Sequence, residues 1–322
     1  MKFIRAILGL ALLLTFTAPA WPQSYPTRPI KLVVPYPPGA STDALGRIIG
    51  QKISERLGQP VLVESRAGAS GMVGSDYVAK SAPDGYTILL GTAATHVVNQ
   101  YLSLKYPFDP IRDFAPIIAA ARNVIVLVVS PSFGVSSLEE LLQKGRSMPE
   151  GIPFGSSGTG SVHHLAGELL SQMTGIKLIH VPYKGGGSAV QDLLSGQLPM
   201  AFSSLVSVES QIRAGKIRAL GITATVPYKN LPNVPPIGHT VKGFELTYNW
   251  LGFFAPAGTP AVIVRLLNQE MARALASPDV IAKLETQGME ILGGSPEQFA
   301  ATIRADHAKA SKLIKDAGIR PE

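Results

Sequence analysis

The sequence of 322 residues contains no cysteine. This absence excludes disulfide bonds, thiol catalysis, cysteine-based zinc sites and attachment to a membrane through a lipidated cysteine. Charged residues are also scarce, at 16% of the chain, and the formal net charge is +7. No basic cluster and no alternation of aromatic with basic residues indicates binding to nucleic acid, whereas a mild positive excess suits a small anionic ligand.

The chain also lacks the short motifs of several enzyme classes. Around Ser70 the second glycine of a G-x-S-x-G nucleophile elbow comes one position early, at Gly71. A phosphate-binding P-loop and a dinucleotide fingerprint are missing as well. His164 and Glu168 lie one helical turn apart and are the best candidates for a metal site, but no third ligand is evident. We therefore predict no catalytic residue, no metal and no cofactor.

The longest uninterrupted apolar run lies at the N-terminus. Lys2 and Arg5 flank its start, the apolar segment covers residues 7–16, and small residues follow at 18–20. This segment is too short to span a bilayer comfortably, and the pattern is typical of a secretory signal peptide. We predict that residues 1–20 are cleaved and that the mature protein is soluble and periplasmic, because no other apolar segment approaches membrane-spanning length.

Residues 30–43 combine a short apolar strand with a bare loop and the start of a helix. The strand covers residues 32–34, the loop contains three prolines and Gly39, and Asp43 opens an amphipathic helix. Such a loop presents free backbone N–H groups at a helix N-terminus, which suit a carboxylate or a phosphate. A well-capped turn that binds nothing is the alternative interpretation.

The plan of this segment returns in the second half of the chain. Between residues 30 and 95, and again between 152 and 204, strands alternate with helices, and the strands end in loops rich in glycine, serine or threonine. This repeat predicts an α/β fold of two lobes, each a mainly parallel sheet flanked by helices. We predict that lobe 1 comprises residues 24–123 and 246–322, including C-terminal helices that return to cover it, and that lobe 2 comprises residues 124–245.

Ligands of open α/β sheets bind outside the carboxyl ends of the strands. We therefore expect the hydroxyl-rich loops of both lobes to face a shared cleft and to hold a small carboxylate through N–H and O–H donors. His163 or His164, at a helix start, either contacts the ligand or serves as a capping or packing residue. Tyr36 and Tyr183 either form a wall of the site or belong to the core. Lys184 is expected to face water.

Six stretches of the chain together carry a family resemblance. They are RPIKLVVPYPPG at residues 28–39 with Asp43, LGQPV at 57–61, PDGYT at 83–87, HLAGE at 164–168, HVPYKG at 180–185 and APAGTP at 255–260. On these motifs, which extend over nearly the whole mature chain, the sequence resembles the Bug-type, TctC-like periplasmic solute-binding receptors of tripartite tricarboxylate transporters.

The resemblance implies a Venus-flytrap periplasmic binding protein, type II-like, that captures a small organic carboxylate without catalysis and delivers it to membrane permease subunits. It also implies that the loops at residues 36–43 and 156–164 hold the ligand from opposite sides, with ordered water bridging the carboxylate. A monomer is expected. The sequence departs from the family pattern at Ala40, at residues 65–68 and at Ser203. At the last of these positions the family often has an acidic or amide residue. Because nothing near Ser203 would pair with an ammonium group, we expect a dicarboxylate or an aromatic carboxylate rather than an amino acid.

The predicted ligand-binding residues come from the loops of both lobes. They are Tyr36, Ala40, Ser41, Thr42, Asp43, Ser70, Thr92, Ser156, Ser157, Thr159, Ser161, His163, His164, Tyr183, Ser203 and Ser204. Asp43 is expected to cap its helix and to order water rather than to meet a carboxylate directly. Two other functions stay open: a receptor that presents its ligand to a membrane kinase, and a hydrolase that uses Ser157 and His164. The hydrolase would need an oriented acid behind the histidine, and the spacing offers no candidate.

Overall fold

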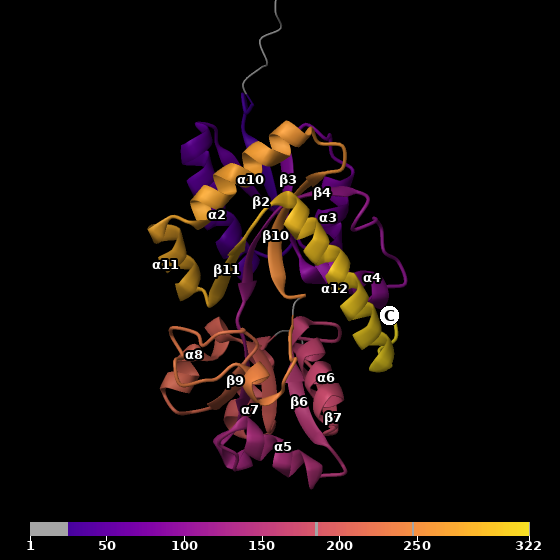
Figure 1. The fold of residues 1–322 in the computed structure, drawn as a ribbon, viewed down its shortest axis with the longest axis vertical. Coiled ribbons are helices and arrows are strands. Elements are labelled where there is room, and N and C mark those ends of the chain that lie inside the picture. The colour runs from indigo at the N-terminus through magenta and orange to yellow at the C-terminus, as the bar shows by residue number, and fades with distance from the viewer. Residues whose placement is uncertain (1–24, 184–185, 247, 322) are drawn as a thin grey trace, which may run out of the picture.

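The structure is a computed structural model that describes residues 25–183, 186–246 and 248–321. The predicted signal peptide and Lys184 lie outside the described residues. Figure 1 shows two α/β lobes stacked along the longest axis of the molecule, with both ends of the described chain on lobe 1 or beside the junction. In the described part of the chain, no helix combines the length and the apolar character that a membrane crossing requires.

Lobe 1 is built on a six-stranded sheet with the order β11-β4-β10-β3-β1-β2. The strands are β1 (Ile30–Val34), β2 (Val61–Ser65), β3 (Thr87–Thr92), β4 (Phe114–Asn123), β10 (Trp250–Pro256) and β11 (Met289–Gly293). The helices of this lobe are α2 (Ser41–Leu57), α3 (Met72–Ala79), α4 (Asn99–Leu102), α10 (Ala261–Leu275), α11 (Pro278–Thr286) and α12 (Pro296–Asp316).

Lobe 2 is built on a five-stranded sheet with the order β7-β6-β8-β5-β9. The strands are β5 (Ile125–Val129), β6 (Ile152–Ser156), β7 (Leu178–Pro182), β8 (Met200–Ser204) and β9 (Arg218–Ile222). The helices are α5 (Leu138–Arg146), α6 (Val162–Thr174), α7 (Gly186–Ser195), α8 (Leu205–Arg213) and α9 (Ile237–Thr240). The two sheets carry the predicted two-lobed α/β architecture, while the predicted lobe boundaries to the residue stay a prediction.

Both sheets are mixed, which corrects the prediction that each is mainly parallel. β1 pairs in parallel with β2 and β3, but β10 is antiparallel to β3 and β4, and β11 is antiparallel to β4. In lobe 2, β6 is parallel to β7 and β8, but β5 is antiparallel to β8 and β9. The reason is connectivity. The chain enters β5 and β10 from the other lobe, at the end of the sheet where the parallel strands finish. Each of these two strands therefore runs opposite to its neighbours.

Helix α2 shows how the sequence brings a helix N-terminus to the junction between the lobes. Leu45, Ile49 and Ile53 recur at helical spacing and are fully buried against the sheet of lobe 1. Gly46 faces the same sheet, where an added Cβ would come 3.0 Å from a Val34 methyl group. The helix therefore packs closely along β1, and its first turn lies beside the carboxyl end of that strand.

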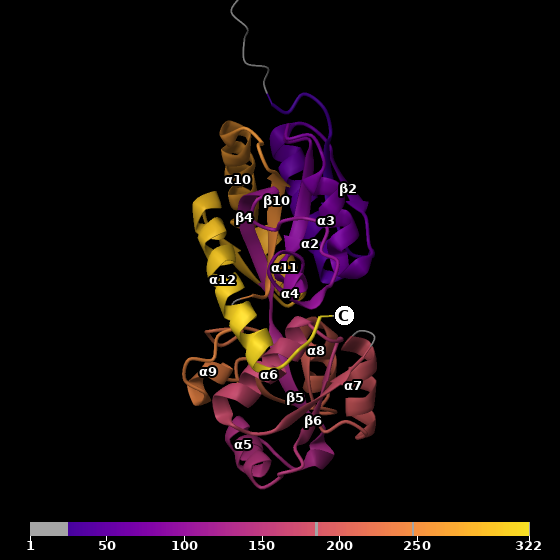
Figure 2. The same ribbon diagram turned by 90° about the vertical axis from the view of Figure 1, so that its right-hand side faces the viewer.

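Helix α12 extends the prediction that the C-terminal helices cover lobe 1, because it also reaches lobe 2. Phe299, near its start, packs in the core under β10, and Leu313, near its end, belongs to the same apolar cluster as Leu165 of α6. The Gln172 side-chain amide of α6 donates a hydrogen bond of 3.4 Å to the Leu313 carbonyl. Figures 1 and 2 show α12 running down one side of the molecule to α6, after which the C-terminal tail turns back toward the junction near α4.

Candidate ligand-binding site

A cavity of about 550 Å³ lies between the lobes at the carboxyl ends of their parallel strands; we call it the interlobe cleft. Of the predicted residues, its wall contains Tyr36, Ala40, Ser41, Thr42, Ser70, Thr92, Ser157, Thr159, Ser161, His163 and Ser204. The other predicted residues, Asp43, Ser156, His164, Tyr183 and Ser203, are not part of the wall. The structure thus brings most of the predicted loop residues of both lobes around one space.

The lobe 1 side of the interlobe cleft begins with a fixed tyrosine. The Tyr36 hydroxyl lies 3.1 Å from the Thr92 hydroxyl and donates to the Ser70 carbonyl at 3.4 Å. Burial raises the pKa of Tyr36, so its hydroxyl keeps its proton at neutral pH. Thr92 is held in turn by Thr95, whose hydroxyl accepts a hydrogen bond of 2.9 Å from the Thr92 N–H. Tyr36 therefore forms a wall of the site rather than part of the interior of the core.

The first turn of α2 presents backbone donors to the same space. The Ala44 N–H donates to the Ala40 carbonyl at 3.0 Å, so the N–H groups of Ser41 and Thr42 precede the hydrogen bonds that the helix makes with itself. The Thr42 side chain is 4% exposed, and its hydroxyl has no hydrogen-bond partner among the described residues. An unpaired buried hydroxyl at a helix N-terminus is suited to an anion or to a water molecule that an anion holds.

Asp43 stabilises this loop and does not line the cleft. Its carboxylate accepts hydrogen bonds from the Gly39 N–H at 3.1 Å and from the Arg47 guanidinium at 3.0 Å. The Arg47 guanidinium, together with the Gly39 N–H, holds the pKa of Asp43 below its usual value. Asp43 lies in the third position of the helix and reaches back to the loop, whereas Ala40 occupies the N-cap position without a side-chain bond. Its role in ordering water stays a prediction.

The lobe 2 side is organised around His163, which is 8% exposed. Its Nδ1 lies 2.7 Å from the Ser157 hydroxyl, and its Nε2 lies 3.1 Å from the Ser204 hydroxyl. Burial lowers the pKa of His163 to about 4, so the ring is neutral at pH 7, with one nitrogen donating and the other accepting. In either tautomer, one of the two serines receives the ring N–H, and its own O–H is then free to donate into the cleft.

His164 turns away from the cleft and belongs to a layer behind it. Its Nδ1 accepts a hydrogen bond of 3.0 Å from the Gly160 N–H, and its Nε2 lies 3.3 Å from the Glu168 carboxylate. Its ring stacks on His180 with 3.6 Å between centroids, and the His180 Nε2 lies 2.6 Å from the Ser156 hydroxyl. Of the two adjacent histidines, His163 therefore lines the site and His164 shapes the loop that forms it.

Tyr183 and Ser203 also lie outside the wall of the cleft. The Tyr183 hydroxyl donates to the Asp192 carboxylate at 2.7 Å, and burial together with this bond raises the pKa of Tyr183 to about 12. Ser203 is 2% exposed, and its hydroxyl has no hydrogen-bond partner among the described residues. Direct contact of either side chain with a ligand stays a prediction.

Sequence reasoning missed a group of residues that line the interlobe cleft. They are Ala93, Ala94, Asn99, Asn123, Gly160, Val162, Tyr248, Asn249, Trp250 and Leu251. Asn123 ends β4, and Asn249 precedes β10, so both lie where the chain crosses between the lobes. The Asn249 side-chain amide donates to the Asn123 carbonyl at 2.5 Å. For Asn123 and Asn249, the sequence offers a single signal, which is a polar residue next to a long apolar strand.

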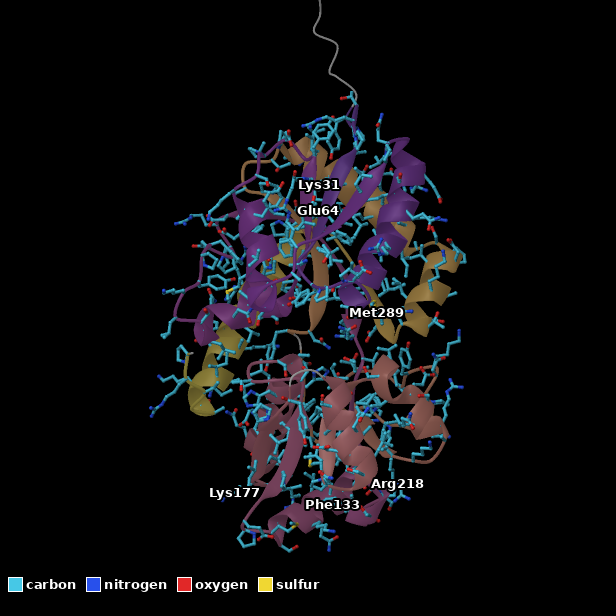
Figure 3. All side chains as sticks on the ribbon, turned by 180° about the vertical axis from the view of Figure 1, so that it is seen from behind. Lys31, Glu64, Phe133, Lys177, Arg218 and Met289 are labelled. Atoms are coloured by element: carbon cyan, nitrogen blue, oxygen red, sulfur yellow. The ribbon has the colours of Figure 1, made fainter. Side chains whose placement is uncertain are left out.

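The described residues that line the interlobe cleft carry no fixed charge. No Lys, Arg, Asp or Glu is among the described residues of its wall, and Figure 3 places the labelled charged residues Lys31, Glu64, Lys177 and Arg218 away from the junction. The donors that converge on the cleft are instead backbone N–H groups, hydroxyls and side-chain amides. Such a neutral set of donors can hold a small anion without chemical change.

The structure bears on the predicted hydrolase pair and on the candidate metal site. The predicted pair of Ser157 and His164 does not form, because Ser157 meets His163 instead. The second ring nitrogen of His163 faces Ser204 rather than a carboxylate, so the acid of a catalytic triad is missing at this position. Within the described ranges, no three His, Asp or Glu side chains gather closely enough to hold a metal ion.

The chain is similar to known proteins over most of its length. The sequence profile of the TctC family, described as the tripartite tricarboxylate transporter family receptor, matches residues 45–319. The protein BugT of Bordetella pertussis is 33% identical over 322 residues, an alignment that covers 99% of this chain and 99% of BugT.

Two solved structures extend the likeness to the fold. A Rhodopseudomonas palustris protein solved with adipate is 37% identical, has a TM-score of 0.80, and the match covers 92% of this chain and 100% of that chain. MatC from Rhodopseudomonas palustris, with bound malate, is 29% identical, has a TM-score of 0.73, and the match covers 90% of this chain and 100% of MatC. These matches confirm the two-lobed fold of a periplasmic binding protein over nearly the whole chain.

Proposed function

Because the chain belongs to the tripartite tricarboxylate transporter receptor family, we propose that it is a periplasmic receptor that captures a small organic carboxylate in its interlobe cleft. In this proposal a signal peptide at residues 1–20 exports the protein, which is soluble and monomeric. Its partners are the membrane permease subunits of a tripartite tricarboxylate-type transporter, to which it delivers the ligand.

The observation that carries the proposal is a cleft to which both lobes contribute helix N-termini and whose described lining holds no charged side chain. Ser41 and Thr42 open α2 on one side, and Ser161 caps α6 on the other by accepting the His164 N–H at 3.2 Å. Each helix N-terminus stabilises a negative charge by about 0.3–1 kcal/mol at an exposed position, and by more where water is excluded. A carboxylate between the lobes satisfies donors of both, so the ligand favours their closed arrangement.

The lining favours a dicarboxylate or an aromatic carboxylate over an amino acid. An α-ammonium group that leaves water is best compensated by a carboxylate of opposite charge, and no Asp or Glu is among the described residues of the wall. Trp250 and Leu251 supply apolar surface beside the hydroxyl groups. The adipate and the malate of the two similar structures are both dicarboxylates, which supports the same class of ligand for this chain.

Binding without turnover is part of the proposal. An acyl-transfer enzyme needs a nucleophile, a base and a group that orients the base. Here the neutral imidazole of His163 bridges two serine hydroxyls, and this arrangement frees one serine O–H to donate to a ligand. In a catalytic cycle the same ring would become an imidazolium, and no carboxylate bonds to it here to stabilise that charge. The family of the chain and its similar structures are solute-binding proteins.

A thermal-shift screen of the mature chain against organic acids tests the proposal. A ligand at a hundred times its dissociation constant stabilises the folded state by about 2.7 kcal/mol, which raises the melting temperature of a protein of this size by several degrees. We expect succinate, malate, adipate or benzoate to give such a shift, and isothermal titration calorimetry then measures the affinity. Stabilisation by amino acids alone, or by no organic acid at all, would contradict the proposal.

A matched pair of serine variants separates binding from catalysis. We expect Ser157→Ala to weaken binding of the best acid about fivefold, since it removes one hydrogen bond of about 1 kcal/mol. Ser147→Ala, at the exposed end of α5, is the control and should leave the affinity unchanged. Turnover of carboxylic esters by the wild type, lost in Ser157→Ala and kept in Ser147→Ala, would replace the receptor by a hydrolase.

A further inference from the structure

A second, smaller cavity of about 240 Å³ adjoins the interlobe cleft; we call it the side cavity. Ser70, Asn99 and Thr159 line both spaces, so the two spaces meet along this shared wall. The rest of the side cavity is lined by Ala69, Met72, Leu102, Ser103 and Arg320. The side cavity is therefore the neighbouring space on this side of the cleft.

Arg320 introduces a positive charge next to a cleft whose described lining is uncharged. Among the described residues that line either cavity, it is the one Lys or Arg. After α12 ends, the Ile319 N–H donates to the Ile314 carbonyl at 3.1 Å, and Ile319 packs against the core. This turn directs the tail back to the junction, as Figure 2 shows. Arg320 is exposed, and no acidic side chain of residues 25–183, 186–246 or 248–321 pairs with it.

The wall that the two cavities share is held in a strained conformation. Ala69 and Ser70 have φ angles of 46° and 53°, a region that costs a residue with a side chain about 1–2 kcal/mol. The strain is offset by bonds to the Ser70 carbonyl, which accepts from the Asn99 side-chain amide at 3.1 Å and from the Tyr36 hydroxyl at 3.4 Å. Backbone strain of this kind concentrates at functional sites, and here it lies at Ser70, which lines both cavities.

We propose that the side cavity is a subsite for the second carboxylate of an extended α,ω-dicarboxylate, and that Arg320 is the cation that pairs with it. The inference rests on the proposed function, because the first carboxylate occupies the interlobe cleft. A guanidinium offers a planar pair of N–H donors that matches a carboxylate. A monocarboxylate of the same length places a methyl group there, so Arg320 selects diacids over monoacids while the neutral cleft binds both.

Calorimetric titration of diacid and monoacid pairs tests the inference. The probes are succinate with butanoate, adipate with hexanoate, and suberate with octanoate, each titrated into the wild type, Arg320→Gln, Arg320→Lys and the control Lys315→Gln. Lys315 lies in the last turn of α12, five residues before Arg320, is exposed, and lines neither cavity. We expect Arg320→Gln to reduce the diacid-over-monoacid preference of the best pair about three- to tenfold. Arg320→Lys should keep part of the preference, and Lys315→Gln all of it.

The outcomes separate this inference from the proposed function. If the wild type binds monoacids as tightly as the matching diacids, or if Arg320→Gln leaves the preference within about twofold of the wild type, the subsite is overturned. The receptor function then stands, because carboxylates still enter the cleft. If none of these acids binds and the thermal screen is also negative, both proposals fall. Added salt should lower the preference of the wild type more than that of Arg320→Gln, because an exposed ion pair is screened.

Discussion

His163→Gln isolates the free-energy cost of keeping one imidazole neutral inside the interlobe cleft. His163 bridges Ser157 and Ser204, and burial lowers its pKa from 6.5 to about 4. In the unfolded chain the same ring titrates near its ordinary value. The unfolded state therefore binds more protons than the folded state between these two values, and this difference makes the folded state less stable as the pH falls.

The size of the effect follows from the two pKa values of His163. Above about pH 7.5 the ring is almost entirely neutral in both states and contributes little pH dependence. Lowering the pH from about 7.5 to about 5 protonates the unfolded state selectively and removes about 2 kcal/mol from the free energy of unfolding of the wild type. Glutamine does not titrate, so His163→Gln does not lose this contribution. At pH 7.5 the variant should be less stable by about 1 kcal/mol, because it cannot bond both serines as the ring does.

Urea unfolding followed by circular dichroism at about pH 7.5 and about pH 5 measures both quantities. The expected result is that the stability difference between wild type and His163→Gln changes by about 2 kcal/mol in favour of the variant at the lower pH. His239→Gln, which removes an imidazole from the exposed helix α9, is the control for a surface substitution. A change smaller than about 0.5 kcal/mol would refute the reasoning that His163 is held neutral by burial.

Two further predictions concern the approach of the lobes. Gly160 has a φ of 72°, and a Cβ there would clash with the Leu102 side chain of the opposite lobe; Gly160→Ala should lose about 1 kcal/mol of stability and bind the best acid more weakly. Adding Leu102→Ala to this variant should restore the affinity measured by calorimetry, but not the stability lost because alanine disfavours the positive φ at position 160. Equal affinity in the wild type, the single variant and the double variant would contradict the clash between position 160 and Leu102. Asn249→Ala removes the bond that ties the two crossings between the lobes together at the Asn123 carbonyl, and it should lower the free energy of unfolding by about 1 kcal/mol. With this bond lost, the ligand-free radius of gyration in small-angle scattering should rise; an unchanged radius would show that the bond does not hold the lobes in place.

The parts of the site that follow a strand directly were open to prediction from the sequence. Ser157 and Thr159 lie in a small-residue loop between an apolar strand and an amphipathic helix, Ser41 and Thr42 open the helix that follows such a loop, and all four line the interlobe cleft. The rule behind them is local: the carboxyl end of a parallel strand, the loop and the helix N-terminus are neighbours along the chain. The sequence also limited the possible functions. The absence of cysteine and of catalytic motifs argued against several enzyme classes, and the family motifs pointed to a solute-binding receptor.

Other features depended on distances in space between residues far apart in the sequence. Adjacent helical positions point about 100° apart, so only the packing of α6 decided that His163 faces the cleft and His164 faces His180. The mixed sheets came from strands that enter from the other lobe, and Asn249 joined the site because such a strand begins there. Composition and local pattern determined two lobes with donor-rich loops, because those rules act between neighbouring residues. The tertiary structure alone decided which side chains share the cleft, since that depends on how the two sheets and the C-terminal tail meet.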